Sequence, residues 1–150
     1  MPDVNVLLYA HRREPPEHER YARWLVELAT GAEPFGLSEL VLSAFVRIAT
    51  NPRAFDPPTD RTSALAFVEH LRGRPTCRAL RPGPKNWGIF TRLCDQVDAK
   101  GKLIADAYHA ALAIEHGCEW ITADLDFARF AGLRWRHPFE AEEGRPRRST

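Results

Sequence analysis

The sequence predicts an α/β domain in which a short, mostly parallel central sheet is flanked by helices. Three observations support this fold class. Short apolar runs typical of buried strands alternate along the chain with stretches whose apolar residues have helical spacing. Such alternation is typical of strands joined by helices, which makes neighbouring strands parallel. The 150 residues contain no internal repeat and no linker, and this length suits one domain.

Capping residues delimit the helices predicted in the first half of the chain. Gly31 closes one helix, Ser38 opens the next after a short strand, and Thr59 opens a third. The second of these helices ends before residues 51–52, because a proline disfavours helix at the residue before it. The apolar run at residues 3–13 is too short for its period to distinguish strand from helix. The three stretches are residues 17–31, 34–52 and 59–73.

The second half of the chain predicts two helices and three short strands. Pro84 opens the first helix and Gly117 closes the alanine-rich second one. The helices cover residues 84–101 and 102–117, the strands cover residues 76–83, 118–124 and 133–138, and a single helical turn covers residues 125–130. Residues 141–150 are charged and have no periodicity, so we expect a disordered tail after a domain of residues 1–140.

Composition excludes several classes of protein. Twenty-one basic and twenty acidic residues give a net charge of +1, so no strong field attracts nucleic acid or membranes, and any contact with nucleic acid must be local. Three cysteines match no zinc-binding pattern and are expected to be reduced. No stretch approaches the roughly 20 apolar residues of a membrane span, and no signal peptide is recognisable. We therefore expect a soluble cytoplasmic protein.

The helix that starts after Ser38 carries one narrow polar stripe. Its other residues are apolar almost all round, which predicts a buried helix. The stripe is about 80° wide at 100° per residue. It consists of Glu39, Ser43, Arg47 and Thr50. A stripe of this kind faces either a polar cleft or a charge on a partner, although Glu39 and Arg47 could also serve structure alone.

Five further polar residues, four of them acidic, stand at the edges of apolar elements. Asp3 and Asn5 accompany the first apolar run, Asp106 lies in the first turn of the alanine-rich helix, and Asp124 and Asp126 follow the strand at residues 118–124. Each has an ordinary explanation. Asp3 could be solvated, Asp106 and Asp126 could interact with a helix dipole, and Asp124 could cap the turn that follows it.

Taken together, the acidic residues predict a metal site. Strand ends and helix starts converge on one crevice in a parallel α/β sheet, and carboxylates gathered there repel one another unless a cation neutralises them. Oxygen ligands select a hard cation such as Mg²⁺ or Mn²⁺. Such a site suits phosphodiester hydrolysis, in which the metal activates a water and orients the scissile phosphate. The residues in question are Asp3, Glu39, Asp106 and Asp124.

The sequence resembles PIN-domain ribonucleases, specifically the VapC-type toxins of bacterial toxin–antitoxin pairs, and most of all the group abundant in mycobacteria. The matching stretches are "DVNVLLYA", "LSELVLSAFVRIATNPRAF", "LIADAYHAALAIEHGCEWITADLDFARFAGLRW" and "HPF". The resemblance implies a three-layer α/β/α fold and Mg²⁺- or Mn²⁺-dependent endonucleolytic cleavage of RNA, often tRNA or ribosomal RNA. It also implies inhibition by a cognate VapB-like antitoxin, and a homodimer.

The resemblance assigns the family's acidic quartet residue by residue. We expect Asp3, Asp106 and Asp124 to hold the metal, partly through water, and Glu39 to orient or deprotonate a water or to complete the set of ligands. Supporting roles fall to Asn5, Thr122, Asp126 and Arg47. Thr122 matches the threonine of the family's T-x-D-x-D-F run and Asp126 its second acidic position, whereas Arg47 could meet a phosphate or pair with the cluster.

One departure from the family concerns the first strand. Only Met1 and Pro2 precede Asp3, so we expect the following residues to begin a helix. Either the native start lies upstream, or Asp3 is anchored less rigidly and binds metal weakly. This departure favours the alternative of a catalytically inactive PIN fold that binds RNA or protein. A haloacid-dehalogenase-type phosphatase would need an Asp-x-Asp pair near its N-terminus, where this chain has Asp3 and Asn5.

RNA binding by a nearly neutral chain would depend on local groups of arginines. The candidates are Arg12, Arg13, Arg129, Arg134 and Arg136, all of which could also be solvated surface residues.

Overall fold

The computed structural model describes residues 1–140, so the tail predicted at residues 141–150 lies outside the described residues. The helices are α1 (Val4–His11), α2 (His18–Thr30), α3 (Glu39–Ala49), α4 (Arg61–Arg72), α5 (Asn86–Val97) and α6 (Lys102–Glu115). The strands are β1 (Phe35–Ser38), β2 (Cys77–Leu80), β3 (Trp120–Ile121) and β4 (Trp135–Arg136), and a 3-10 helix, η1 (Leu125–Arg129), lies between the last two.

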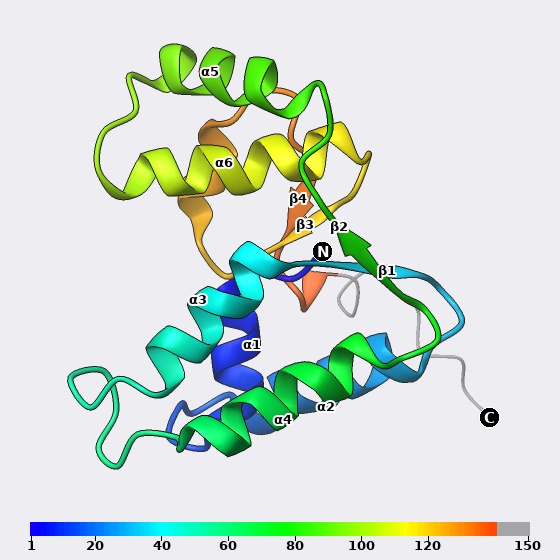
Figure 1. The fold of residues 1–150 in the computed structure, drawn as a ribbon, viewed down its shortest axis with the longest axis vertical. Coiled ribbons are helices and arrows are strands. Elements are labelled where there is room, and N and C mark those ends of the chain that lie inside the picture. Colours follow the sequence, from blue (N-terminus) through cyan, green and yellow to red (C-terminus); the bar gives the residue numbers. More distant parts are fainter. Residues whose placement is uncertain (141–150) are drawn as a thin grey trace.

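The strands form two parallel pairs. β1 pairs with β2, and β3 pairs with β4. Figure 1 shows these strands between α5 and α6 on one side and the helices α1 to α4 on the other. The α/β/α arrangement and the parallel pairing are therefore confirmed. The expected single sheet is instead divided into two pairs, because strands of two to four residues present few groups for further pairing.

The N-terminus is bound to the end of the chain's third strand. Pro2 forms a parallel bridge with Ile121, whose N–H donates to the carbonyl of Met1 over 2.9 Å. The N–H of Asp3 in turn donates to the carbonyl of Ile121 over 2.8 Å. α1 then begins at Val4, as expected from the short N-terminus. The first three residues thus act as a short strand that positions Asp3 beside β3.

Side-chain caps explain where the helices of the first half begin. Ser38 caps α3, as predicted, by accepting the N–H of Val41 over 3.2 Å. The prediction of Thr59 as the cap of α4 is wrong, since Asp60 accepts the N–H of Ser63 over 2.8 Å. Asp60 is the better cap because its carboxylate also complements the helix dipole.

The boundaries of α5 also differ from the prediction. The helix begins at Asn86 rather than Pro84 and ends at Val97, because Asp98 adopts a left-handed conformation with φ of 48°. Aspartate tolerates this conformation better than most residues, so it can terminate a helix without glycine.

The core extends through all the helices and β3, and one of its aromatic contacts lies between α3 and α4. Phe45 of α3 is fully buried, and its ring stacks on Phe67 of α4 with centroids 4.9 Å apart. The prediction that α3 is buried on nearly all sides is wrong. One face is buried, whereas Leu40 is 43% exposed at the first turn. None of the helices in residues 1–140 is long and apolar enough to cross a membrane.

Replacing the central ring tests this account of the core. We expect Phe45→Ala to lower the free energy of unfolding by about 3–5 kcal/mol, because it removes buried apolar surface and leaves a cavity beside Phe67. Urea denaturation measures the change. Val26→Ala, on the exposed side of α2, is the control and should change stability by less than about 0.5 kcal/mol. A loss below about 1 kcal/mol for Phe45→Ala would contradict this packing.

Candidate active site

A cavity of about 510 Å³ gathers most of the residues predicted to form the site. It lies between α1, α3, α6 and the turn that follows β3. We call it the acidic cavity and define it by Asp3, Asn5, Arg47, Lys102, Asp106, His109 and Asp124. The carboxylates of three predicted metal ligands, from three elements far apart in the sequence, therefore line one space.

Asp3 is firmly anchored in this cavity. Its Oδ2 accepts the hydroxyl of Thr122 over 2.6 Å and the amide of Asn5 over 3.2 Å, and its Oδ1 accepts the N–H of Val4 over 2.6 Å. Asn5 Oδ1 accepts the N–H of Ala123 over 3.3 Å, which ties α1 to the turn after β3. The expectation that a short N-terminus leaves Asp3 loosely anchored is therefore wrong, because side-chain hydrogen bonds replace a longer strand.

Asp124 both caps a helix and faces the cavity. Its Oδ1 accepts the N–H of Asp126 over 2.9 Å at the start of η1, and its own N–H donates to the hydroxyl of Thr122 over 3.0 Å. Its Oδ2 accepts a hydrogen bond from Lys102 over 3.0 Å. Asp126 lies outside the acidic cavity, where its exposed side chain pairs with Arg129 over 3.5 Å.

Lys102 places its ammonium group between two of the carboxylates. Its Nζ lies 3.0 Å from Oδ2 of Asp106 and 3.0 Å from Oδ2 of Asp124. Lys102 was not among the predicted site residues. Lys102 lies four residues before Asp106 on the same helix, and this spacing could have predicted the pairing of these two residues. The contact with Asp124 depends on the tertiary structure.

The pKa values of the acidic residues report their different environments. Burial, together with the charges of Asp106 and Asp124, raises the pKa of Asp3 to about 6, although hydrogen bonds from Thr122 and Val4 oppose this. Burial also raises the pKa of Asp106, against the effect of Lys102. Burial acts in the same direction on Asp124, but the N–H of Asp126 and the ammonium of Lys102 outweigh it and lower the pKa. The cavity therefore contains more negative charge than its lysine balances.

His109 also lines the acidic cavity, although it was not among the predicted site residues. It lies one turn after Asp106 on α6, is buried, and stacks on Trp120 with ring centroids 5.3 Å apart. Burial and the charge of Lys102 lower the pKa of His109 to about 4, so the ring is neutral at pH 7. Its Nδ1 has no hydrogen-bond partner within residues 1–140. The spacing of three residues from Asp106 is the signal that could have identified it.

Glu39 is not brought together with the other three acidic residues. Its Oε1 lies 3.7 Å from Arg81 and 4.0 Å from Arg72, at the edge of neighbouring cavities. Ser43 and Arg47, from the same predicted stripe, do line the acidic cavity. Leu40, the next residue on the helix, does line the acidic cavity, so Glu39 is separated from it by the direction of its side chain, whose carboxylate lies against Arg81 and Arg72.

Most arginines considered for RNA binding have structural contacts. Arg12 is buried, donates to the carbonyl of Pro57 over 2.9 Å and lies over the ring of Phe55. Arg136 donates to Glu119 over 2.7 Å, and Arg134 donates to the carbonyl of Gly117. These three arginines therefore stabilise loops and strand ends. Arg129 pairs with the exposed carboxylate of Asp126.

The donor set suits a hard divalent cation. Asp106 and Asp124 already share one positive group, the ammonium of Lys102, and Asp3 adds a carboxylate in the same cavity. Within residues 1–140, however, no three acidic, histidine or cysteine side chains are grouped closely enough to form a complete metal site. Asp106 and Asp124, with Asp3 in the same cavity, are the residues that would hold such a cation, and water would supply its further ligands.

Comparison with known proteins identifies relatives along nearly the whole chain. The PIN domain model matches residues 1–133. The ribonuclease VapC43 of Mycobacterium tuberculosis is 46% identical over 140 residues, which are 93% of this chain and 95% of the relative. The ribonuclease VapC25 of the same organism is 43% identical over 136 residues, which are 91% of this chain and 96% of the relative.

Solved structures share the fold at lower sequence identity. The structure of VapBC2 from Rickettsia felis, bound to a DNA fragment from its promoter, aligns with a TM-score of 0.68 and 17% identity over 91% of this chain and 96% of that one. VapBC-1 from nontypeable Haemophilus influenzae aligns with a TM-score of 0.67 and 16% identity over 93% of this chain and 98% of that one. These likenesses concern the fold.

The raised pKa of Asp3 predicts a pH-dependent stability. Because folding raises this pKa from 3.8 to about 6, the contribution of Asp3 is most favourable below pH 3.8 and is lost as the pH rises through 6. The full change is about 2–3 kcal/mol. We expect Asp3→Asn to lack this loss, so the unfolding free energy of wild type relative to Asp3→Asn should fall between pH 4 and pH 7 in urea titrations with EDTA.

The exposed Asp98→Asn serves as the control for this measurement and should follow wild type across the range. If the difference in unfolding free energy between wild type and Asp3→Asn stays constant with pH, burial does not raise the pKa of Asp3.

Proposed function

This chain belongs to the PIN domain family, in its VapC group, and from that membership we propose that it is a metal-dependent endoribonuclease, the toxin of a toxin–antitoxin pair. The observation that carries the proposal is the acidic cavity. There the carboxylates of Asp106 and Asp124 both contact the ammonium group of Lys102, and Asp3 lines the same cavity. Metal-dependent hydrolysis of a phosphodiester uses oxygen ligands gathered in this way to hold the cation that activates the water.

Mg²⁺ or Mn²⁺ is the cofactor that we propose for this site. Asp106 and Asp124 would hold the ion, with Asp3 as a further ligand, directly or through water. When bound, the cation would polarise the scissile phosphate and favour deprotonation of an attacking water.

The side chains of the cavity would divide the remaining work. Asp3, whose position is set by Thr122 and Asn5, would accept a hydrogen bond from the attacking water and orient it. Lys102, once displaced from between the two carboxylates, would be free to donate to a phosphate oxygen. Arg47, on the α3 wall, would bind the same phosphate or its neighbour. Water would attack phosphorus, and the bond from phosphorus to the leaving ribose oxygen would break.

The roles predicted for Glu39 and Asp126 stay predictions. Glu39 pairs with Arg81 outside the acidic cavity, and Asp126 supports the position of Asp124 through its backbone N–H rather than its carboxylate. The chemistry that we propose therefore depends on Asp3, Asp106 and Asp124.

A protein partner follows from the same family membership. We propose that a cognate VapB-like antitoxin binds and inhibits this chain, in line with the two-component VapBC names of the structural relatives. The homodimer stays a prediction. The alternative of an inactive binding module was favoured by the short stretch before Asp3, whereas the hydrogen bonds that position that carboxylate support the proposed enzyme.

An RNA cleavage assay tests the proposed activity. We expect the wild-type protein to cut a fluorescent single-stranded RNA with Mg²⁺ or Mn²⁺ and not with EDTA. Asp106→Asn should cut about 100-fold more slowly or worse, because it weakens the binding of the cation. Asp98→Asn, an exposed aspartate at the end of α5, is the matched control and should cut like wild type.

Two outcomes would contradict the proposed activity. Equal cleavage in EDTA would refute the metal-dependent mechanism. RNA binding by both wild type and Asp106→Asn without cleavage by either would favour the inactive binding module.

Lys102 offers a test of the cation position that does not depend on activity. We expect Lys102→Met to melt about 1–4 °C lower than wild type in EDTA, because Asp106 and Asp124 lose a shared counter-ion whose exposure limits its contribution. Mg²⁺ should raise the melting temperature of Lys102→Met more than that of wild type, since the ion no longer competes with the ammonium. Lys100→Met, whose exposed lysine pairs with Asp98, is the control.

Equal Mg²⁺-induced shifts in wild type and Lys102→Met would show that the ion binds elsewhere.

A further inference from the structure

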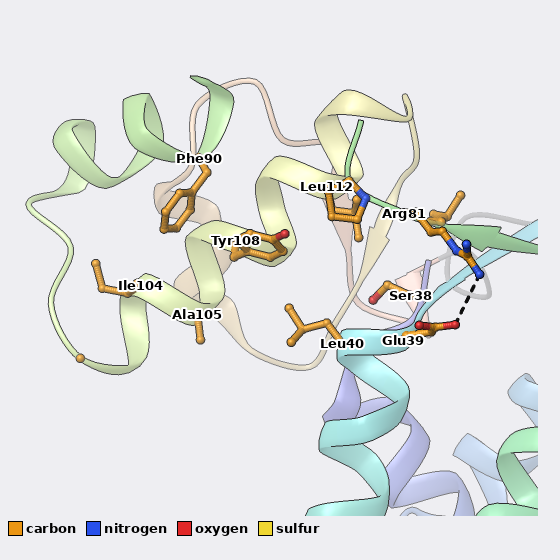
Figure 2. A pocket seen from close by; sticks show the side chains of 12 residues that line it. Ser38, Glu39, Leu40, Arg81, Phe90, Ile104, Ala105, Tyr108 and Leu112 are labelled. Carbon is orange, nitrogen blue, oxygen red and sulfur yellow. Dashed lines mark ion pairs between the residues drawn. The ribbon is translucent and has the colours of Figure 1, made fainter. Parts of the chain in front are cut away.

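α6 presents different faces to two cavities. Figure 2 shows Ile104, Tyr108 and Leu112 on the face that lines a cavity of about 520 Å³. Asp106 and His109, one turn apart, line the acidic cavity instead. Because side chains on a helix lean toward the preceding turn, the ring of His109 leans toward the turn that contains Asp106. The position of His109 on the helix therefore places its ring beside a proposed ligand of the cation.

The ring of His109 is held in place by stacking. It lies on the indole ring of Trp120 with centroids 5.3 Å apart and planes inclined by 20°, and the histidine is only 8% exposed. Trp120 is itself fully buried and contacts Phe127, with ring centroids 5.3 Å apart. The plane of the imidazole is therefore set by packing before any ligand binds, as is typical of preorganised sites.

Nδ1 of His109 has a capacity for hydrogen bonding that the protein does not use. The atom is buried and has no hydrogen-bond partner within residues 1–140. Buried polar atoms are nearly always paired with protein groups or ordered water, because an unpaired one costs free energy. Since Nδ1 is shielded from bulk solvent, a partner for it must be a molecule held in place inside the protein. An unpaired nitrogen on a residue that lines the acidic cavity therefore points to a ligand there.

Packing alone does not require a histidine at this position. Phenylalanine would cover Trp120 as well and would leave no polar atom unpaired. In the described part of the chain, Thr76, Asn86 and Trp120 also have a buried side-chain atom without a partner, but none of these residues lines the acidic cavity. The position of His109 therefore distinguishes it from the other three, and its nitrogen calls for a functional explanation.

The chemistry of an imidazole suits a water molecule bound to a cation. In its neutral form the ring has one nitrogen that donates a hydrogen bond and one that accepts. A divalent cation polarises the O–H bonds of its water ligands, which makes them strong donors. Mg²⁺ usually keeps several such waters when one or two carboxylates bind it. A fixed acceptor nitrogen beside the carboxylates can therefore orient one of these waters.

We propose that His109 is a positioning residue whose Nδ1 accepts a hydrogen bond from a water ligand of the proposed cation. The proposal rests on the proposed function, because the cation is the one assigned to Asp106 and Asp124. Nδ1 acts through the water rather than as a direct ligand, in line with the absence of a complete metal site among the acidic, histidine and cysteine side chains that the structure describes. His109 thereby strengthens the binding of the cation and fixes the position of one of its waters.

Two substitutions separate the nitrogen from the ring. His109→Phe keeps an aromatic ring on Trp120 and removes the nitrogen, whereas His109→Asn keeps a hydrogen-bonding group close to the position of Nδ1 and removes the stacking. Melting temperatures over a series of Mg²⁺, Mn²⁺ and Zn²⁺ concentrations measure the affinity for each cation, and those in EDTA measure the stability of the cation-free protein. The matched control is His70→Phe, which replaces an exposed histidine on α4.

The two variants should differ in opposite directions. In EDTA, His109→Phe should melt at or above the temperature of wild type, because a carbon replaces an unpaired buried nitrogen. It should need about 10-fold more Mg²⁺ or Mn²⁺ for the same stabilisation, as is typical when a group that orients a metal ligand is removed. His109→Asn should melt lower and keep most of the affinity. His109→Leu also lacks the nitrogen and decides the matter if His109→Phe fails to fold, and His70→Phe should behave like wild type.

The outcomes separate this proposal from the proposed function. Unchanged cation affinity in His109→Phe overturns the proposal and leaves the residue a packing role. Equal losses of affinity in His109→Phe and His109→Asn overturn it as well, because the ring rather than the nitrogen then matters. A loss seen with Zn²⁺ and not with Mg²⁺ identifies a direct nitrogen ligand and also overturns it. If wild type binds Mg²⁺ and cuts no RNA, the proposed function fails while the affinities still decide the role of His109, and a wild type that binds no cation defeats both.

Discussion

The hydrogen bond from Thr122 to Asp3 is the interaction on which the site depends. It joins residues 119 positions apart, and it is buried. The same hydroxyl accepts the N–H of Asp124, so one side chain sets the positions of two carboxylates. Because the first three residues also pair with Ile121, the N-terminus and the turn after β3 form a single structural unit. Without that unit, α1 would have no defined start and the acidic cavity would lose one wall.

A shortage of positive charge is the second constraint. Three carboxylates line the acidic cavity, and the ammonium of Lys102 serves two of them. Burial of Asp3 beside these charges raises its pKa, which shows that the arrangement is costly for the protein alone. Such a cost is typical of functional sites, where charges are arranged for a ligand rather than for stability. A divalent cation is the ligand that would relieve this cost.

The acidic cavity holds the groups that we propose for the chemistry, and helices form most of its walls. α1, α3 and α6 line it together with Asp124 from the turn after β3. The relative positions of its side chains are therefore set mainly by rigid elements rather than by loops. α5 contributes no residue to its lining.

The sequence by itself determined the types and order of the elements, because apolar spacing and caps such as Ser38 act within a few residues. It also predicted that Asp3, Asp106 and Asp124 share one site, since each stands at the edge of an apolar element, and the structure places all three in the acidic cavity. Only the tertiary structure decided which polar groups meet. It placed Glu39 beside Arg81, inserted Lys102 between two carboxylates, and turned Arg12 to a structural role. Periodicity indicates which way a side chain points, but such contacts also depend on axial position and on residues distant in the chain.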